Sequence, residues 1–172
     1  MLLPQDLYVL LKLSCLNDSW TFRTLSEQLF LSVSQIHSGL RRAEAAGLYS
    51  AKQRRPVSQC VEELIVHGVR YVFAAKPGAL VLGMPTSYAA PPLSSIIVAS
   101  TAPQPVWPFA EGKIMGYTIE PLHNCAPKAA LLDEKFYALL SLVDAIREGR
   151  IRERKIAEKE IHERIRKRSS HE

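Results

Sequence analysis

The sequence predicts an α+β fold, because stretches with a helical period alternate with short β-prone runs along the 172 residues. Apolar residues recur every three to four positions over 4–16, over 24–46 and again from Leu131 onward. Between these stretches, 69–75 is rich in β-branched and aromatic residues and is bounded by glycine and proline, which is typical of a strand. We expect three units, which cover 1–76, 77–130 and 131–168.

The first two helices are expected at the N-terminus. Pro4 suits the first turn of a helix over 4–16. The segment 20–22 has the composition of a short edge strand. Thr24, with Glu27 three residues later, has the spacing of a capping box and predicts the start of the second helix.

A third helix is predicted after a turn at Leu31. Ser32 is its expected N-cap, Ile36, Leu40 and Ala43 form its buried stripe, and Gly47 ends it. The opposite face carries small polar and basic side chains, namely Ser34, Gln35, Ser38, Arg41 and Arg42. Gln pairs with adenine, Arg pairs with guanine, and Ser reaches bases or phosphates. This face is therefore typical of a helix that enters the DNA major groove.

A basic turn follows the third helix. We predict a strand at 48–51, a turn that carries Lys52, Arg54 and Arg55, a helix over 58–68 and a second strand at 69–75. Basic side chains beside a reading helix favour contact with a phosphate backbone.

The stretch 20–55, about a fifth of the chain, resembles winged-helix transcriptional regulators of the MarR-like kind. The resemblance rests on LSEQL at 25–29, LSVSQIH at 31–37 and LRRAEAAGL at 40–48. It implies a winged helix-turn-helix domain and a homodimer on a palindromic or repeated operator. The predicted helix between the two strands of the wing, and the second half of the chain, depart from the usual pattern.

The middle segment 77–130 holds nine of the eleven prolines, which excludes helix from most of it. Short strands are expected at 96–98 and 114–119. The segment is too apolar for a disordered linker, so we predict an extended, packed, proline-rich connection.

The C-terminal segment is predicted to be helical. One broad apolar face is expected from Leu132, Phe136, Leu139, Leu140, Val143 and Ile146. A charged helix follows Gly149, with Glu148–Arg152, Glu160–Arg164 and Glu163–Lys167 at ion-pair spacing. Two interpretations stand: a solvated helix face, or an arm that dimerises the chain or docks a protein partner.

Composition narrows the class of protein. The net charge is +5, and 147–168 carries ten Lys or Arg against five Glu. No apolar run reaches the roughly 20 residues of a membrane helix, and no secretory signal is recognisable. Three scattered cysteines favour free thiols in the cytoplasm. His123 and Cys125 have no third partner in the sequence, so we expect no metal, no cofactor and no enzymatic activity.

The sequence thus predicts a cytoplasmic, homodimeric regulator that binds double-stranded DNA, with repression of transcription as the default outcome. The predicted contact residues are Thr24, Ser32, Ser34, Gln35, His37, Ser38, Arg41, Arg42, Lys52, Arg54 and Arg55. The alternative is a protein-interaction scaffold or antitoxin-like subunit that uses a winged-helix fold.

Overall fold

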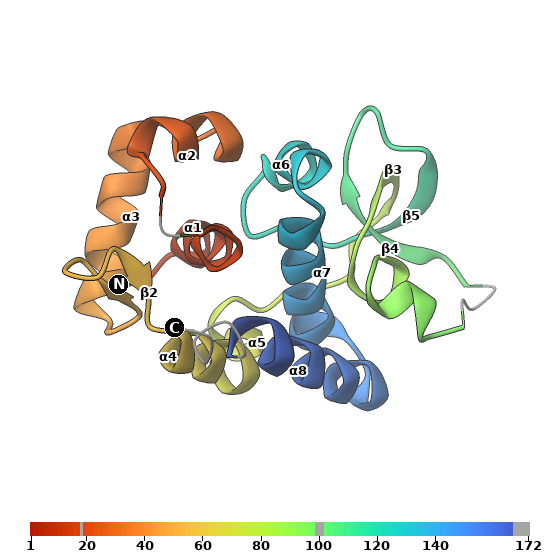
Figure 1. Ribbon diagram of the computed structural model, residues 1–172. Coiled ribbons are helices and arrows are strands. Elements are labelled where there is room, and N and C mark those ends of the chain that lie inside the picture. Colours follow the sequence, from red (N-terminus) through yellow and green to blue (C-terminus); the bar gives the residue numbers. More distant parts are fainter. Residues whose placement is uncertain (18, 99–101, 167–172) are drawn as a thin grey trace.

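The computed structural model describes residues 1–17, 19–98 and 102–166, and there the chain is an α+β protein, as predicted (Figure 1). The N-terminal helices lie on one side of the molecule and a small β-barrel lies on the other, with helix α7 between them. No helix in these three ranges is long and apolar enough to cross a membrane.

The N-terminal side is built from α1 (Pro4–Cys15), α2 (Phe22–Leu29), α3 (Val33–Ala45) and a hairpin of β1 (Tyr49–Ser50) and β2 (Arg55–Pro56). The two strands are antiparallel and pair Tyr49 with Pro56. The third helix is confirmed at both ends. Ser32 is its N-cap, and Gly47 follows it with a left-handed φ of 74° that residues with a Cβ avoid.

Two local predictions in this region are wrong. The segment 20–22 is not a strand, and α2 begins at Phe22, so the cap lies one helical turn before Thr24. Thr21 is the N-cap, and its Oγ1 accepts a hydrogen bond of 3.1 Å from the N–H of Thr24. Thr24 therefore closes the capping box in the place that the sequence assigned to Glu27.

The predicted strand at 69–75 is also wrong. One helical segment runs through α4 (Ser58–Glu63), a π-helical turn (Leu64–Gly68) and α5 (Val69–Val72). Val69 is fully buried and Phe73 is nearly so. This burial stabilises the helix although its residues have a high β-propensity. As a consequence, the hairpin closes directly between Tyr49 and Pro56, without the intervening helix that the sequence suggested.

The middle of the chain forms the barrel. Its strands are β3 (Leu80–Pro85), β4 (Gln104–Pro108) and β5 (Ile114–Thr118), and β3 is antiparallel to the other two, which are mutually parallel. Pro85 and Pro108 stand at strand ends, where the missing N–H costs no ladder bond. The strand expected near 114–119 is confirmed as β5. The strand expected at 96–98 is wrong, because 3-10 turns at Ser87–Ala89 and Leu93–Ser95 precede it and no ladder reaches it.

Three helices close the fold, namely α6 (Ala126–Leu132), α7 (Glu134–Glu148) and α8 (Ile151–Ile165). The predicted apolar face of α7 is confirmed for Phe136, Leu139, Leu140, Val143 and Ile146, which are at most 3% exposed. Leu132 is the exception. It ends α6 and is 62% exposed, because Asp133 interrupts the helix and caps α7.

The charged helix α8 lies against α7 and α4. Ile161 and Ile165 are buried, whereas Ile151 is exposed. The predicted pair Glu160–Arg164 is confirmed at 3.2 Å. Glu148, which was expected to pair with Arg152, accepts a hydrogen bond from Ser87 at 2.7 Å. Lys167, like the predicted end of the segment at 168, lies outside the described residues.

A buried polar network joins α7 to the barrel. The Asp144 carboxylate accepts hydrogen bonds from Thr86 Oγ1 at 2.7 Å, Trp107 Nε1 at 2.6 Å and Arg147 Nη1 at 2.7 Å. Arg147 also donates to the carbonyl of Phe73 at 2.7 Å. Because each charged group is paired and hydrogen-bonded, the network fixes how the barrel, α5 and α7 sit together.

Candidate nucleic-acid interface

The outer face of α3 presents the polar residues that the sequence selected. Ile36, Leu40 and Ala43 are buried, so the helix has one fixed inner side. The exposed positions are Ser34, Gln35, His37, Ser38 and Arg41. In the described part of the chain, the Arg41 guanidinium takes part in no ion pair, so its charge faces solvent.

Capping contacts engage three of the predicted site residues. Ser32 Oγ accepts the N–H of Gln35 at 3.2 Å, and Gln35 Oε1 accepts the N–H of Ser32 at 2.9 Å. The amide nitrogen of Gln35 thus remains as an outward donor. Thr24 Oγ1 donates to the carbonyl of Thr21 at 2.9 Å, so this hydroxyl serves the start of α2.

Arg42 points away from the exposed face and binds a buried carboxylate, that of Asp6. Its Nε and Nη2 donate to the two carboxylate oxygens of Asp6 at 2.8 and 2.7 Å. The Asp6 side chain is fully buried, and its hydrogen bond raises the pKa of Arg42. Gly39 makes room for this pair, since a Cβ there would lie 2.9 Å from Asp6 Oδ1. Arg42 therefore holds α1 against α3.

Arg54 is held by the residues in front of α2. Its guanidinium lies over the Trp20 ring, 4.5 Å from the centroid, and its Nη2 donates to the Trp20 carbonyl at 3.1 Å. Trp20 Nε1 in turn donates to the Arg54 carbonyl at 3.0 Å. These contacts fix the tip of the hairpin relative to α2. Lys52 is exposed on the same turn, and Arg55 Nε donates to Gln53 at 3.3 Å.

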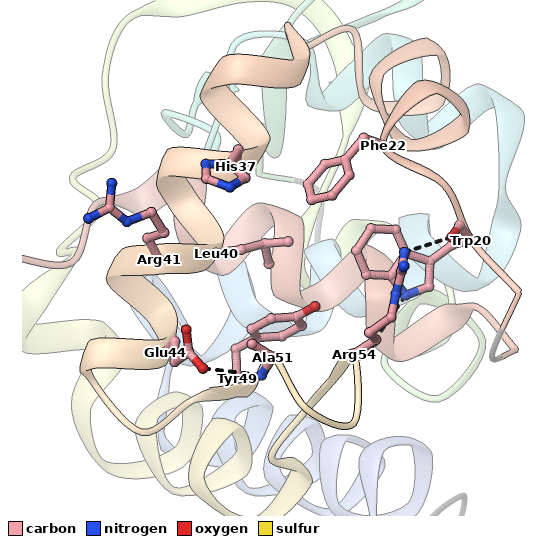
Figure 2. A pocket seen from close by; sticks show the side chains of 9 residues that line it. All are labelled: Trp20, Phe22, His37, Leu40, Arg41, Glu44, Tyr49, Ala51 and Arg54. Atoms are coloured by element: carbon pink, nitrogen blue, oxygen red, sulfur yellow. Dashed lines mark hydrogen bonds between the residues drawn. The ribbon is translucent and has the colours of Figure 1, made fainter.

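A pocket of about 260 Å³ opens between α3, the hairpin and the start of α2 (Figure 2). Its lining residues are Trp20, Phe22, His37, Leu40, Arg41, Glu44, Tyr49, Ala51 and Arg54. Leu40 lies in the middle, between Phe22 and His37 on one side and Tyr49 on the other. Glu44 Oε1 accepts the N–H of Ala51 at 3.3 Å and so ties α3 to the hairpin.

Six of these pocket residues are absent from the predicted site, namely Trp20, Phe22, Leu40, Glu44, Tyr49 and Ala51. The sequence does carry one signal for Trp20. With Thr21 as N-cap, Trp20 and Leu25 stand at the spacing of a hydrophobic staple, which fixes the chain entering a helix. The other five residues meet only because α2 and the hairpin both pack against α3.

A second cavity, of about 450 Å³, lies where the barrel meets the junction of α7 and α8. Tyr88, Tyr117, Glu148 and Glu153 line it. Burial raises the pKa of Glu148, although a hydrogen bond from Ser87 opposes this shift. Burial and the neighbouring Glu148 also raise the pKa of Tyr117. Both shifts favour the protonated forms of Glu148 and Tyr117.

His123 is engaged in packing beside Cys125. His123 stacks on Tyr8 with 5.4 Å between centroids, and its Nδ1 accepts the N–H of Cys125 at 3.2 Å. Burial lowers the pKa of His123. The three cysteines, Cys15, Cys60 and Cys125, form no disulfide. Among the described residues, no cluster of three or more His, Cys, Asp or Glu side chains is arranged to hold a metal ion.

Comparisons with known proteins add no relative: no protein family, no curated protein and no solved structure matches this chain. The interpretation of the α3 surface therefore depends on its own geometry and chemistry.

Proposed function

We propose that the chain is a sequence-specific regulator that binds double-stranded DNA through a winged helix-turn-helix. The observation that carries the proposal is the outer face of α3, where Ser34, Ser38 and Arg41 are exposed beside a short basic hairpin. The helices α2 and α3, the turn between them and the following hairpin have the order of such a domain.

The side chains on α3 match the donors and acceptors of base edges. Arg41 can bond guanine O6 and N7, and the Gln35 amide nitrogen can donate to an acceptor in the major groove. Ser34 and Ser38 are short enough to let the helix approach closely. Together these groups supply the sequence-reading part of the interface.

The hairpin supplies the contact to the backbone. Lys52 and Arg55 are exposed on a turn whose position the Trp20–Arg54 stack fixes. Phosphate contacts of this kind set the register of a reading helix. We assign Arg42 to folding instead, because its guanidinium is committed to Asp6.

The proposal includes a cytoplasmic homodimer that binds a repeated DNA site. Its binding would block a promoter and so repress transcription. Occupying a promoter is the simplest way in which a DNA-bound protein regulates transcription. A twofold-symmetric dimer would double the base contacts of α3, whose single face spans only a few base pairs.

A gel-shift assay on DNA fragments from the chain's own upstream region, repeated across a salt series, tests the proposal. The expected result is binding with a steep linear fall of log affinity against log salt. Arg41→Ala should lower the affinity about tenfold, since a bidentate arginine–guanine pair accounts for roughly that factor. Arg152→Ala changes an exposed arginine in the first turn of α8, outside the proposed interface; it is the matched control and should change nothing. Equal affinities for both variants, or no salt dependence, contradict the proposal.

A protein-interaction scaffold is the second candidate, and the outer surface of the barrel favours it. Leu82 and Met115 pair across β3 and β5 and are 44% and 60% exposed. Leu80, also on β3, is 58% exposed. Exposed apolar groups that share one sheet face are typical of interaction surfaces. A scaffold would bind DNA weakly and without a salt slope.

A further inference from the structure

We propose that the aromatic pocket between α3 and the hairpin receives one unstacked nucleotide of the bound DNA, preferentially one whose base carries an amino group. The inference depends on the proposed DNA-binding function and assigns a specific role to a part of the same surface. The chemistry of the pocket walls, its size and its charge support it.

The walls suit a flat ring. Phe22 and His37 stand on one side, with ring centroids 5.9 Å apart, and Tyr49 stands on the other (Figure 2). The Arg54 guanidinium is fixed on Trp20 and is a second flat surface that lines the pocket. Proteins that hold unpaired bases use aromatic rings and arginine planes in this way.

The volume limits the occupant to a single ring system. About 260 Å³ is below the roughly 300–1,000 Å³ of sites for drug-sized ligands. Leu40, only 5% exposed, closes the pocket at its base, so an inserted ring would meet an apolar surface.

Charge selects a nucleotide over an uncharged ring. Arg54 lines the pocket and Lys52 is exposed on the adjacent turn, so a phosphate attached to the ring would meet cations. Glu44 is the one acid in the lining. Its Oε1 is engaged with the N–H of Ala51, which leaves the other oxygen to accept from an amino group, as carboxylates do with cytosine.

Fluorescence anisotropy with three duplexes tests the inference: one fully paired, one with a single unpaired cytosine and one with a single unpaired thymine. We expect the cytosine duplex to bind about tenfold more tightly than the paired one, which corresponds to one base stacked on aromatic groups. The thymine duplex should lie between them, because thymine lacks the amino group. Glu44→Gln should remove the difference between cytosine and thymine.

Two variants disrupt the pocket in different ways. Ala51→Phe fills it from the exposed hairpin, and Phe22→Ala removes a wall. Each should abolish the preference for the unpaired base, and circular dichroism checks that each still folds. Tyr71→Ala removes an aromatic ring that is 78% exposed and not part of the pocket, and it should leave the preference intact.

The outcomes separate the two proposals. Equal, salt-dependent binding of all three duplexes overturns the pocket inference and leaves the proposed function standing. A preference that survives both pocket variants also overturns it. Free CMP that binds the pocket while the three duplexes bind equally assigns the site to a free nucleotide, which again overturns it. Failure to bind any duplex overturns the proposed function and this inference together.

Discussion

The outer face of α3 and the inner face of α7 use the same kinds of side chain in opposite ways. On α7, Arg147 and Asp144 are 6% and 1% exposed and bind each other, two backbone carbonyls, Thr86 and Trp107. On α3, Arg41 is exposed and makes no ion pair with a described residue. A buried charge must be satisfied within the fold, whereas an exposed charge is available to a partner.

Arg42 shows that the boundary between the two uses is sharp. It follows Arg41 directly, yet it forms a bidentate pair with the buried Asp6. Successive residues of a helix point about 100° apart, so Arg41 faces solvent and Arg42 faces α1. The comparison therefore predicts that substitutions at α7 and at Arg42 change stability, whereas substitution at Arg41 changes binding.

The largest expected effect is at Arg147. Arg147→Met leaves the Asp144 carboxylate buried without its cation and removes two hydrogen bonds to backbone carbonyls. We expect a loss of about 3–5 kcal/mol in the free energy of unfolding, measured by urea denaturation. Arg152→Met, an exposed arginine on α8, is the control and should change it by less than about 0.5 kcal/mol. A loss at Arg147 as small as the control's would refute the assignment of a fold-determining network.

The second largest loss in the free energy of unfolding is expected at Arg42. Arg42→Met leaves Asp6 unpaired and should cost about 2 kcal/mol, less than at Arg147 because the Arg42 side chain is 28% exposed. Arg41→Ala should cost less than about 0.5 kcal/mol in the same assay. Adding Asp6→Asn to Arg42→Met should recover part of the loss, and purely additive losses would show that the two residues are not coupled.

A pH-dependent effect is expected at Asp133, which caps α7 and binds Lys12 at 2.6 Å. Burial alone would raise its pKa, but the hydrogen bonds from Lys12 and from the N–H of Phe136 lower it overall. The ionised carboxylate therefore contributes stability above its ordinary pKa, and this contribution is lost as the pH falls through the lowered value.

Asp133→Asn should accordingly cost about 1–2 kcal/mol at pH 7, because the buried Lys12 loses its counter-charge. Urea denaturation at pH 7, 5 and 3 should show the difference from the unaltered chain shrinking at the lowest pH. A difference that is the same at every pH would mean that the Asp133 charge plays no part.

The smallest effect is expected at Glu148, and its sign is opposite. Because its pKa is raised, the fold favours the protonated form, and that contribution is lost as the pH rises through the raised value. Glu148→Gln imitates the protonated form. The variant should match the unaltered chain near pH 4 and be more stable by less than about 1 kcal/mol at pH 7. Thermal unfolding at the two pH values measures this, and a destabilised variant at pH 7 would contradict it.

The predictions from the sequence were most accurate for features that depend on residues close together in the chain. Ser32 caps α3, and Phe136 and Val143 lie on the buried face of α7, because caps and apolar periods act within about one turn. The prediction was wrong at 69–75, where β-prone residues form a helix because Val69 and Phe73 are buried in the core.

The sequence alone thus determined most of the helices, the cap of α3 and its polar face, because these follow from residue spacing. The tertiary structure decided which charges on that face are available and where a pocket forms. Asp6 and Arg42 are 36 positions apart, and Arg147 and Phe73 are 74 apart. Contacts at such separations leave no local pattern, so only the folded chain shows that Arg41 faces outward while Arg42 holds the interior.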